Sequence, residues 1–240
     1  MKHLLLSMPH PKFIAHLQAI EGLSEDERRQ IAGLPSTLRQ VSDGEIVLRQ
    51  DEDASRCVFV VSGFLYQARI VGDRSQILAF HVPGDMPCLH TLLVSPMDAD
   101  LVGLGPSIVG YVAHSQLKQL LDSSIHLTRA FWRETLIDAA ISRQWIARLG
   151  AQAALPKVAH LICELAARLE VVGLVKNGCF QIPMTQRHVA DACGLSIVHV
   201  NRTLQELRGR RLIAWEGSEI ELLQPDELRA LADFTPDYLT

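Results

Sequence analysis

The chain lacks any pairing or motif spacing among its cysteines. Its 240 residues include five cysteines, none with Cys-x-x-Cys spacing. These are Cys57, Cys88, Cys163, Cys179 and Cys193. Scattered cysteines are typical of a reducing compartment, which predicts a cytoplasmic protein without a disulfide framework. An iron–sulfur cluster would need a close group of thiolates, and the sequence offers none.

Long apolar runs and familiar catalytic motifs are also missing. The first residues hold only three consecutive leucines, Leu4 to Leu6, before polar residues and Pro9. That run is too short for a signal-peptide core or a membrane span. No Gly-x-Ser-x-Gly elbow, Walker loop, dinucleotide fingerprint or His-Glu-x-x-His motif occurs. The sequence therefore predicts neither membrane association nor enzymatic activity, and none of these motifs indicates a bound metal or cofactor.

An overall excess of positive charge is absent, because the formal net charge is −4. The charges are nevertheless segregated along the chain. Residues 151–215 hold eight Lys and Arg against four Asp and Glu, whereas residues 216–240 hold one against seven. A local cationic segment suits contacts to phosphate, and an acidic tail would be held away from a duplex. This distribution favours a site-specific DNA binder over a protein that coats DNA regardless of sequence.

A helix-turn-helix pattern lies inside the cationic segment. Thr185 can cap a first helix, Gln186–Cys193, and Gly194 follows where a steep turn needs a positive φ. Ser196 can cap a second helix. Its predicted buried stripe recurs at three- and four-residue steps and consists of Val200, Thr203, Leu204 and Leu207. The outward face is polar and cationic, on an element thin enough to enter a major groove. The alternative is ordinary packing of two helices.

Two predicted hairpins flank this helix pair and favour a winged helix. Leu212–Trp215 and Glu219–Leu223 alternate around a Gly-Ser turn, which is the pattern of a wing. Leu174–Phe180 is a second hairpin pattern, because Asn177-Gly178 is a strong two-residue turn signal. A winged helix that binds a protein partner instead of DNA is the alternative, and salt-dependent DNA affinity would discriminate the two.

The first half of the chain alternates between short apolar runs and turn formers. The predicted strands are Thr37–Val41, Glu45–Leu48, Cys57–Val61, Leu65–Val71, Gln76–His81 and Ser107–Val112. Turns such as Ser62-Gly63 and Pro83-Gly84-Asp85 separate them. Many short strands at close spacing predict a compact antiparallel barrel or jelly roll. Upstream, Ser24 and Glu27 form a capping box that opens a short helix through Ile31.

A long helix is predicted from Ser124 to about Leu149, ended by Gly150. Its apolar positions are more numerous than one buried face needs, so we expect a second copy of the helix to cover the surplus. The predicted dimer interface consists of Leu127, Phe131, Ile137, Ile141 and Trp145. The alternative is a single long helix in the core of a monomer. Pro156 near the first turn of the next helix, Lys157 to about Leu169, starts the DNA-binding domain.

Together these segments predict an α+β protein of two or three parts. An antiparallel β-roll occupies residues 1–122, a long dimerisation helix residues 123–150, and a winged helix-turn-helix residues 151–240.

The order of these parts resembles the Crp/Fnr family of bacterial transcription regulators over nearly the whole chain. The likeness is strongest from Met184 to Leu207 and at Arg211-Leu212-Ile213, and moderate at Asp43–Ile46, Val58–Gly63 and Val82–Asp85. The resemblance implies a homodimer that binds double-stranded DNA, with sensing of a small-molecule effector in the β-roll transmitted through the long helix. RNA polymerase is a further partner that such a regulator can have.

The same resemblance assigns residues to the DNA interface. They are Thr185, Gln186, Arg187, Ser196, Ile197, Val198, His199, Asn201 and Arg202. Arg202 stands where the family reads guanine through O6 and N7, while Thr185, Arg187, Ser196 and His199 would contact phosphates. Asn201 would add a base or phosphate contact. Many members have Glu where this chain has Val198, which predicts an operator that differs at that step.

The sensor half departs further from the family pattern. The predicted effector pocket consists of Pro83, Gly84, Asp85, Cys88, Leu89 and His90. Leu89 or a neighbour replaces the carboxylate that would hold a ribose, and Asp98 and Asp100 stand where a phosphate-binding Arg is expected. We therefore expect no cyclic AMP binding in the usual mode. A haem, metal or other small-ligand sensor is the alternative, with His81, Cys88 and His90 as candidate ligands or as ordinary side chains.

Overall fold

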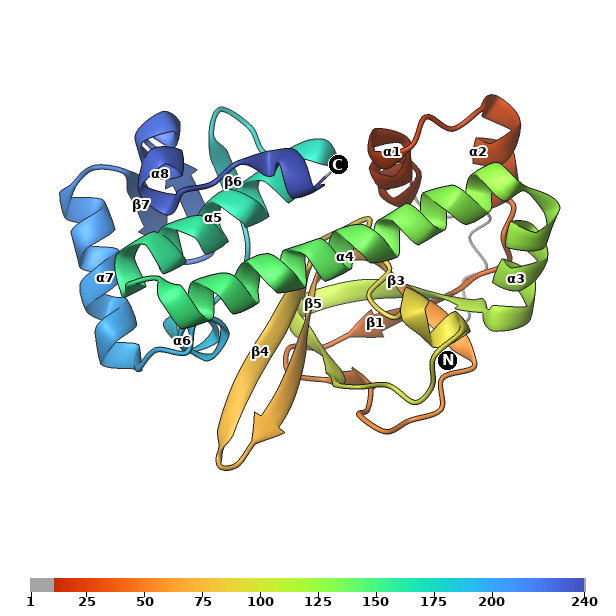
Figure 1. Cartoon of the computed structure of the whole chain (residues 1–240), viewed down its shortest axis with the longest axis horizontal. Coiled ribbons are helices and arrows are strands. Elements are labelled where there is room, and N and C mark those ends of the chain that lie inside the picture. Colours follow the sequence, from red (N-terminus) through yellow and green to blue (C-terminus); the bar gives the residue numbers. More distant parts are fainter. Residues whose placement is uncertain (1–10, 240) are drawn as a thin grey trace. The chain divides into compact units, whose positions relative to one another are not determined.

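The computed structural model describes residues 11–239, so the predicted lack of a signal peptide at the start of the chain lies outside them. The chain forms two compact units, one of residues up to 68 with 80–139, the other of residues 69–79 with those from 140 onward. The division falls inside α4 (Ile125–Ala151), which Figure 1 shows as one continuous helix. The three-part division of the sequence stays a prediction. Within residues 11–239 no helix is both long and apolar enough to cross a bilayer.

The N-terminal half is built on an antiparallel sheet, which confirms the predicted α+β class. Its strands are β1 (Thr37–Val41), β2 (Ile46–Leu48), β3 (Arg56–Val71), β4 (Arg74–His81) and β5 (Asp100–Ala113). The order is β1-β5-β3-β4, and β2 also pairs with β5. Because β5 pairs with three other strands, it is the central element of the roll.

The predicted turn at Ser62-Gly63 is wrong, because β3 runs through it as one strand. Instead, the register with β5 shifts on both sides of Ser62, as in a β-bulge. Gly63 has φ +74°, and a Cβ there would lie 2.4 Å from Ser107 Oγ. The backbone N–H of Phe64 donates to the same Oγ at 2.9 Å. The glycine at this position therefore allows the irregular backbone of β3 and its close approach to β5. It does not form a turn between two strands.

The core of the first unit contains three aromatic rings in tilted and edge-to-face contact. Phe13, from α1 (Pro11–Ile20), lies 5.9 Å from the Phe59 ring and 5.8 Å from the Phe131 ring, measured between centroids. Phe59 covers Gly110, where a Cβ would fall 2.1 Å from the ring. These contacts hold α1, the sheet and the first half of α4 together, since apolar burial at native density stabilises each partner.

Two polar clusters attach the N-terminal helices to α4. The predicted capping box is confirmed at the start of α2 (Glu25–Ala32), where Ser24 and Glu27 bond reciprocally. Burial raises the pKa of Glu27, but hydrogen bonds from the Ser24 backbone and from His126 outweigh it and lower that pKa to about 2. His16 of α1 lies 2.7 Å from the buried carboxylate of Glu134. α1 itself was not predicted from the sequence.

The rest of the first unit connects the sheet to α4. The short helix η1 (Leu89–Leu92) follows the Gly-Asp turn, and α3 (His114–Ser123) follows β5. Ser124 then caps α4 as predicted, because its Oγ accepts the backbone N–H of Leu127 at 3.2 Å. α4 continues one residue past Gly150, to Ala151.

The second unit contains a winged helix. Its helices are α5 (Ala154–Val171), α6 (Gln186–Cys193), α7 (Ile197–Gly209), α8 (Pro225–Ala232) and η2 (Pro236–Leu239). Its strands are β6 (Cys179–Gln181), β7 (Ile213–Glu216) and β8 (Glu219–Leu222), in the order β6-β8-β7. The predicted wing is confirmed as β7–β8. The turn at Asn177-Gly178 also forms, but β6 pairs with β8 of the wing and only a single bridge closes that turn.

Candidate nucleic-acid interface

Both helices of the predicted helix-turn-helix begin at the expected caps. Thr185 Oγ1 accepts the backbone N–H of His188 at 3.3 Å, while His188 Nδ1 accepts that of Thr185 at 3.1 Å. Ser196 Oγ accepts the backbone N–H of His199 at 3.2 Å. Between the helices, Gly194 adopts φ +63°, as the turn requires. Local sequence therefore determines where α6 ends and α7 begins.

α7 has one buried face and one free face. The buried side chains are those predicted, namely Val200, Thr203, Leu204 and Leu207. On the opposite face Val198 is 64% exposed and Ile197 is 44% exposed. His199 and Arg202 are exposed beside them. An apolar and cationic ridge of this kind can reach base edges and phosphates in a major groove.

Arg202 is an exposed cation on the free face of α7. Its guanidinium makes no hydrogen bond or ion pair with the described residues. Arg187 on α6 is also exposed, but its Nε lies 3.1 Å from Asp191 Oδ2, which offsets part of its charge. The planar guanidinium of Arg202 therefore keeps all five donors for a partner, which suits bidentate contact with a guanine edge.

Asn201 occupies a different position from the one expected. Its side chain is half-buried, and Nδ2 donates to Gln186 Oε1 at 3.3 Å. The bond joins the first residue of α6 to the middle of α7 and holds the two helices in register. Asn201 is thus directed at Gln186 in this structure, and its predicted contact to a base or phosphate stays a prediction.

The helix starts at Thr185 and Ser196 supply further groups for phosphate. Both caps are exposed, and the Ser196 hydroxyl still has its own proton to donate, whereas the Thr185 hydroxyl also lies 3.1 Å from His188 Nδ1. Helix N-termini carry partial positive charge, so a phosphate near either start is stabilised. Arg208, by contrast, donates to the Trp215 carbonyl at 2.8 Å and joins α7 to the wing.

The residues predicted at the dimer interface lie inside the chain. Leu127, Phe131, Ile137, Ile141 and Trp145 are at most 8% exposed. They form the face of α4 that packs on its own chain, so they cannot also cover a partner. The free apolar side chains of α4 are Ile125, Trp132, Leu136, Ile146 and Leu149, of which Trp132 is 63% exposed. Sequence analysis missed this second stripe as the candidate interface.

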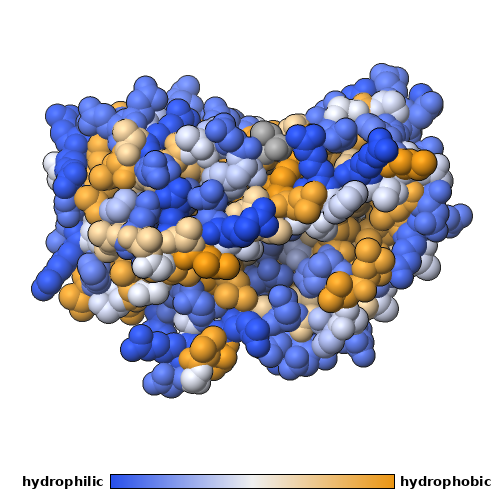
Figure 2. Space-filling view, in the orientation of Figure 1, coloured by the Kyte–Doolittle hydropathy of each residue, from blue (hydrophilic) through white to orange (hydrophobic). Residues whose placement is uncertain are grey.

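The exposed stripe has the periodicity of a helix pair. Trp132, Leu136, Ala139, Arg143 and Ile146 follow one another at alternating steps of four and three residues. This is the spacing at which one helix packs along another. Figure 2 shows apolar residues interleaved with hydrophilic ones along the course of α4. The signal in the sequence was the excess of apolar positions, but it did not reveal which stripe was free.

The residues of the predicted effector pocket lie in the turn after β4 and in η1. All except His90 are buried. Asp85 Oδ2 accepts the backbone N–H of Val82 at 2.8 Å, and Cys88 Sγ accepts that of Val58 at 2.8 Å. A hydrogen bond with Cys88, together with burial, raises the pKa of the Cys57 thiol. The polar groups of this turn therefore hold local structure, and the pocket stays a prediction.

The alternative metal site is not assembled. Across residues 11–239, His, Cys, Asp and Glu do not gather in threes that could hold a metal ion, so His81, Cys88 and His90 do not converge as ligands. Leu89, at the position of the expected carboxylate, is 5% exposed and belongs to the apolar core. Asp100 Oδ1 accepts the backbone N–H of Gln50 at 2.7 Å, and Asp98 is exposed.

Known proteins with this arrangement are transcription regulators. Residues 156–231 match the family model described as Crp-like helix-turn-helix domain, and residues 38–124 match the cyclic nucleotide-binding domain. The transcriptional activator protein Anr of Pseudomonas protegens is 25% identical over 195 residues, which cover 81% of this chain and 80% of that protein. The nitrogen fixation regulation protein FixK of Bradyrhizobium diazoefficiens is 26% identical over 192 residues, 80% of each chain.

Solved structures show the same fold. FixK2 from Bradyrhizobium japonicum matches with a TM-score of 0.75 and 25% identity, over 84% of this chain and 100% of that one. A CooA mutant from Carboxydothermus hydrogenoformans matches with a TM-score of 0.66 and 12% identity, over 95% and 97% of the two chains. The likeness extends over both units of the protein.

Proposed function

Because the chain belongs to the Crp/Fnr family of DNA-binding transcription regulators, we propose that it acts as a homodimer on a palindromic operator. The observation that carries the proposal is the exposed, unpaired Arg202 on the free face of a capped α7. Two such helices, one from each protomer, would meet two half-sites about one helical turn apart, roughly 34–36 Å. The exposed stripe on α4, with Trp132 and Leu136, supplies the surface for the second copy.

Direct base contacts in this proposal come from two residues. Arg202 reads guanine through O6 and N7, and Val198 offers an apolar contact such as one to a thymine methyl. Thr185, Ser196, Arg187 and His199 contact phosphates and fix the register without reading sequence. Relatives such as Anr are named transcriptional activators, so we extend the proposal to activation, which brings RNA polymerase as a partner.

Selection of bound sequences from a random DNA pool tests this function. The wild-type protein is expected to enrich an inverted repeat with half-sites centred about one turn apart. In the same selection, Val198→Glu is expected to shift one symmetric position toward C·G, because a carboxylate accepts from cytosine N4. Val171→Glu, a like change at an exposed residue that ends α5, is the matched control and should leave the motif unaltered.

Two outcomes of that selection count against the proposal in different ways. Failure of the wild-type protein to enrich any inverted repeat contradicts a dimeric operator-binding function. An unaltered motif for Val198→Glu, with binding retained, removes Val198 from the set of base-reading residues.

In the β-roll, we propose that cyclic AMP does not bind in the usual mode. Leu89 is buried where a ribose would need a carboxylate, and Asp98 and Asp100 would repel a phosphate. Calorimetric titration with cyclic AMP is expected to give no tight, stoichiometric uptake. Saturable heat at one nucleotide per protomer would contradict this. A different small molecule as effector remains compatible with the proposal.

A further inference from the structure

A fully buried carboxylate joins three segments of the second unit. Glu164 of α5 is 0% exposed, and its Oε2 accepts the Trp145 Nε1–H of α4 at 3.1 Å and the Tyr238 hydroxyl of η2 at 3.0 Å. Arg168 Nη1 lies 3.6 Å from Oε1. Burial and the neighbouring Glu164 charge raise the pKa of Tyr238, so its hydroxyl stays protonated and donates. We call Glu164, Trp145, Arg168 and Tyr238 the Glu164 cluster.

Stability alone does not account for such a cluster. Removing a carboxylate and a guanidinium from water is costly, and apolar replacements of similar volume are often as stable. What a buried polar cluster can provide is a unique arrangement, because each donor has one direction in which it is satisfied. Here the arrangement that it defines is that of the end of α4 relative to α5 and to the C-terminal segment.

A second set of bonds attaches the end of α4 to the same segment. Arg148 is 9% exposed, and its guanidinium donates to the carbonyl of Ala232 at 3.2 Å and to that of Asp233 at 2.9 Å. These carbonyls end α8, where a helix carries partial negative charge. The His160 ring stacks on that of Tyr238, with centroids 6.2 Å apart. The last turns of α4 are thus held by side chains from α5 and by the backbone after α8.

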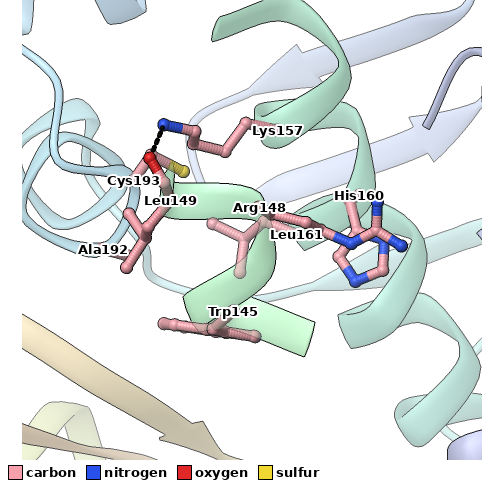
Figure 3. A pocket seen from close by; sticks show the side chains of 8 residues that line it. All are labelled: Trp145, Arg148, Leu149, Lys157, His160, Leu161, Ala192 and Cys193. Atoms are coloured by element: carbon pink, nitrogen blue, oxygen red, sulfur yellow. Dashed lines mark hydrogen bonds between the residues drawn. The ribbon is translucent and has the colours of Figure 1, made fainter. Parts of the chain in front are cut away.

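The same turns of α4 reach the helix-turn-helix. Figure 3 shows Trp145, Arg148 and Leu149 facing a small cavity whose other walls come from α5 and α6. Its volume is about 20 Å³, enough for roughly one water molecule. Lys157 donates to the Leu149 carbonyl at 3.3 Å, and a Cβ on Gly194 would lie 3.4 Å from Leu149 Cδ2. The end of α4 therefore touches the turn that sets the direction of α7.

From this geometry we propose that Glu164 is a positioning residue, which fixes the angle between the end of α4 and α7 and thereby the half-site spacing that the dimer accepts. The proposal rests on the proposed function, since it assumes a dimer joined along α4. Glu164 does not touch DNA, and it acts through Trp145 and Tyr238. Loosening the cluster leaves α7 and its base contacts intact but lets each α7 take a range of directions.

The test compares operators that differ only in spacing. Full-length Glu164→Gln and Tyr238→Phe are titrated against the selected operator and against versions lengthened or shortened by one base pair between half-sites. We expect the wild-type protein to prefer the selected spacing, and both variants to lose about threefold or more of that preference, because a pre-organised arrangement is what discriminates. Binding to an isolated half-site should be unchanged.

Glu170→Gln, the same chemical change at an exposed position on α5, is the matched control and should keep the preference. A merely structural role of Glu164 would lower the active fraction equally for every operator and leave the ratio unchanged, and that result overturns the proposal. Tyr238→Phe keeps the ring and its packing, so it provides the comparison if Glu164→Gln does not fold. A wild-type protein with no spacing preference at all would instead contradict the dimeric operator-binding function.

Discussion

Replacing Leu136 and Ile146 together by Asp is expected to convert the proposed dimer to monomers and to lower operator affinity by roughly 10²- to 10⁴-fold. Leu136 is 51% and Ile146 is 69% exposed, so neither supports the core of its own protomer. Across a helix pair, four carboxylates would meet an apolar seam and repel one another. Each half-site would then be bound separately, without the gain that comes from tethering two recognition helices.

Light scattering for mass and a gel-shift titration on the full operator measure these effects. The matched control is Ile70→Asp with Leu93→Asp, two exposed apolar residues outside α4, which should leave both mass and affinity unchanged. A double variant of α4 that remains dimeric would show that the exposed stripe is not the interface.

Arg202→Ala is expected to weaken binding to the selected operator by about 1–3 kcal/mol, or roughly 5- to 150-fold in the dissociation constant, while binding to unrelated DNA changes less. The side chain has no hydrogen bond or ion pair with residues 11–239, so its loss breaks no such bond there. What would disappear is the proposed bidentate bond to a guanine edge, which a phosphate contact does not replace.

A competition gel shift against nonspecific duplex measures this ratio. Arg210→Ala removes a cation from the other end of α7, where it is paired with Glu206, and serves as the control. Arg210→Ala should change the dissociation constants for operator and for nonspecific DNA by similar small factors. Equal weakening on operator and nonspecific DNA by Arg202→Ala would assign Arg202 to a phosphate instead of a base.

The helix-turn-helix was predictable because its determinants are local. The side chains of Thr185 and Ser196 each accept a hydrogen bond from the backbone N–H three residues further along the chain. Gly194 supplies the positive φ that the turn between the helices requires. The exposed face of α4 was not predictable in the same way. Both Phe131 and Trp132 are apolar, and only the fold of the rest of the chain decides that Phe131 is buried and Trp132 exposed. The periodicity of apolar residues indicates how many apolar faces a helix has, but not which other part of the protein covers each face.

Contacts between residues far apart in the sequence explain the other differences between the sequence-based predictions and the structure. Ser62-Gly63 has the composition of a turn, but the register with β5 extends the strand through it. The Glu164 cluster was not predicted, because Trp145 and Tyr238 reach Glu164 only after folding, whereas Arg168 lies one turn away on the same helix. The Asn201–Gln186 bond likewise depends on the angle between two helices. Contacts between distant segments are set by tertiary packing, and the local propensities of the residues give no information about it.

The positions of the cysteines have a practical consequence for labelling. Cys57, Cys88, Cys163 and Cys193 are buried, and only Cys179, on β6, has partial access to solvent. A thiol must lose its proton before it attacks an electrophile, and burial raises the pKa of Cys163 and of Cys193 to about 12. Burial and the nearby charges of Glu221 and Glu219 raise the pKa of Cys179 as well, so what sets it apart is access to solvent. The chain therefore carries one accessible thiol beside wing strand β8, where a fluorophore can be attached at alkaline pH without replacing the other cysteines.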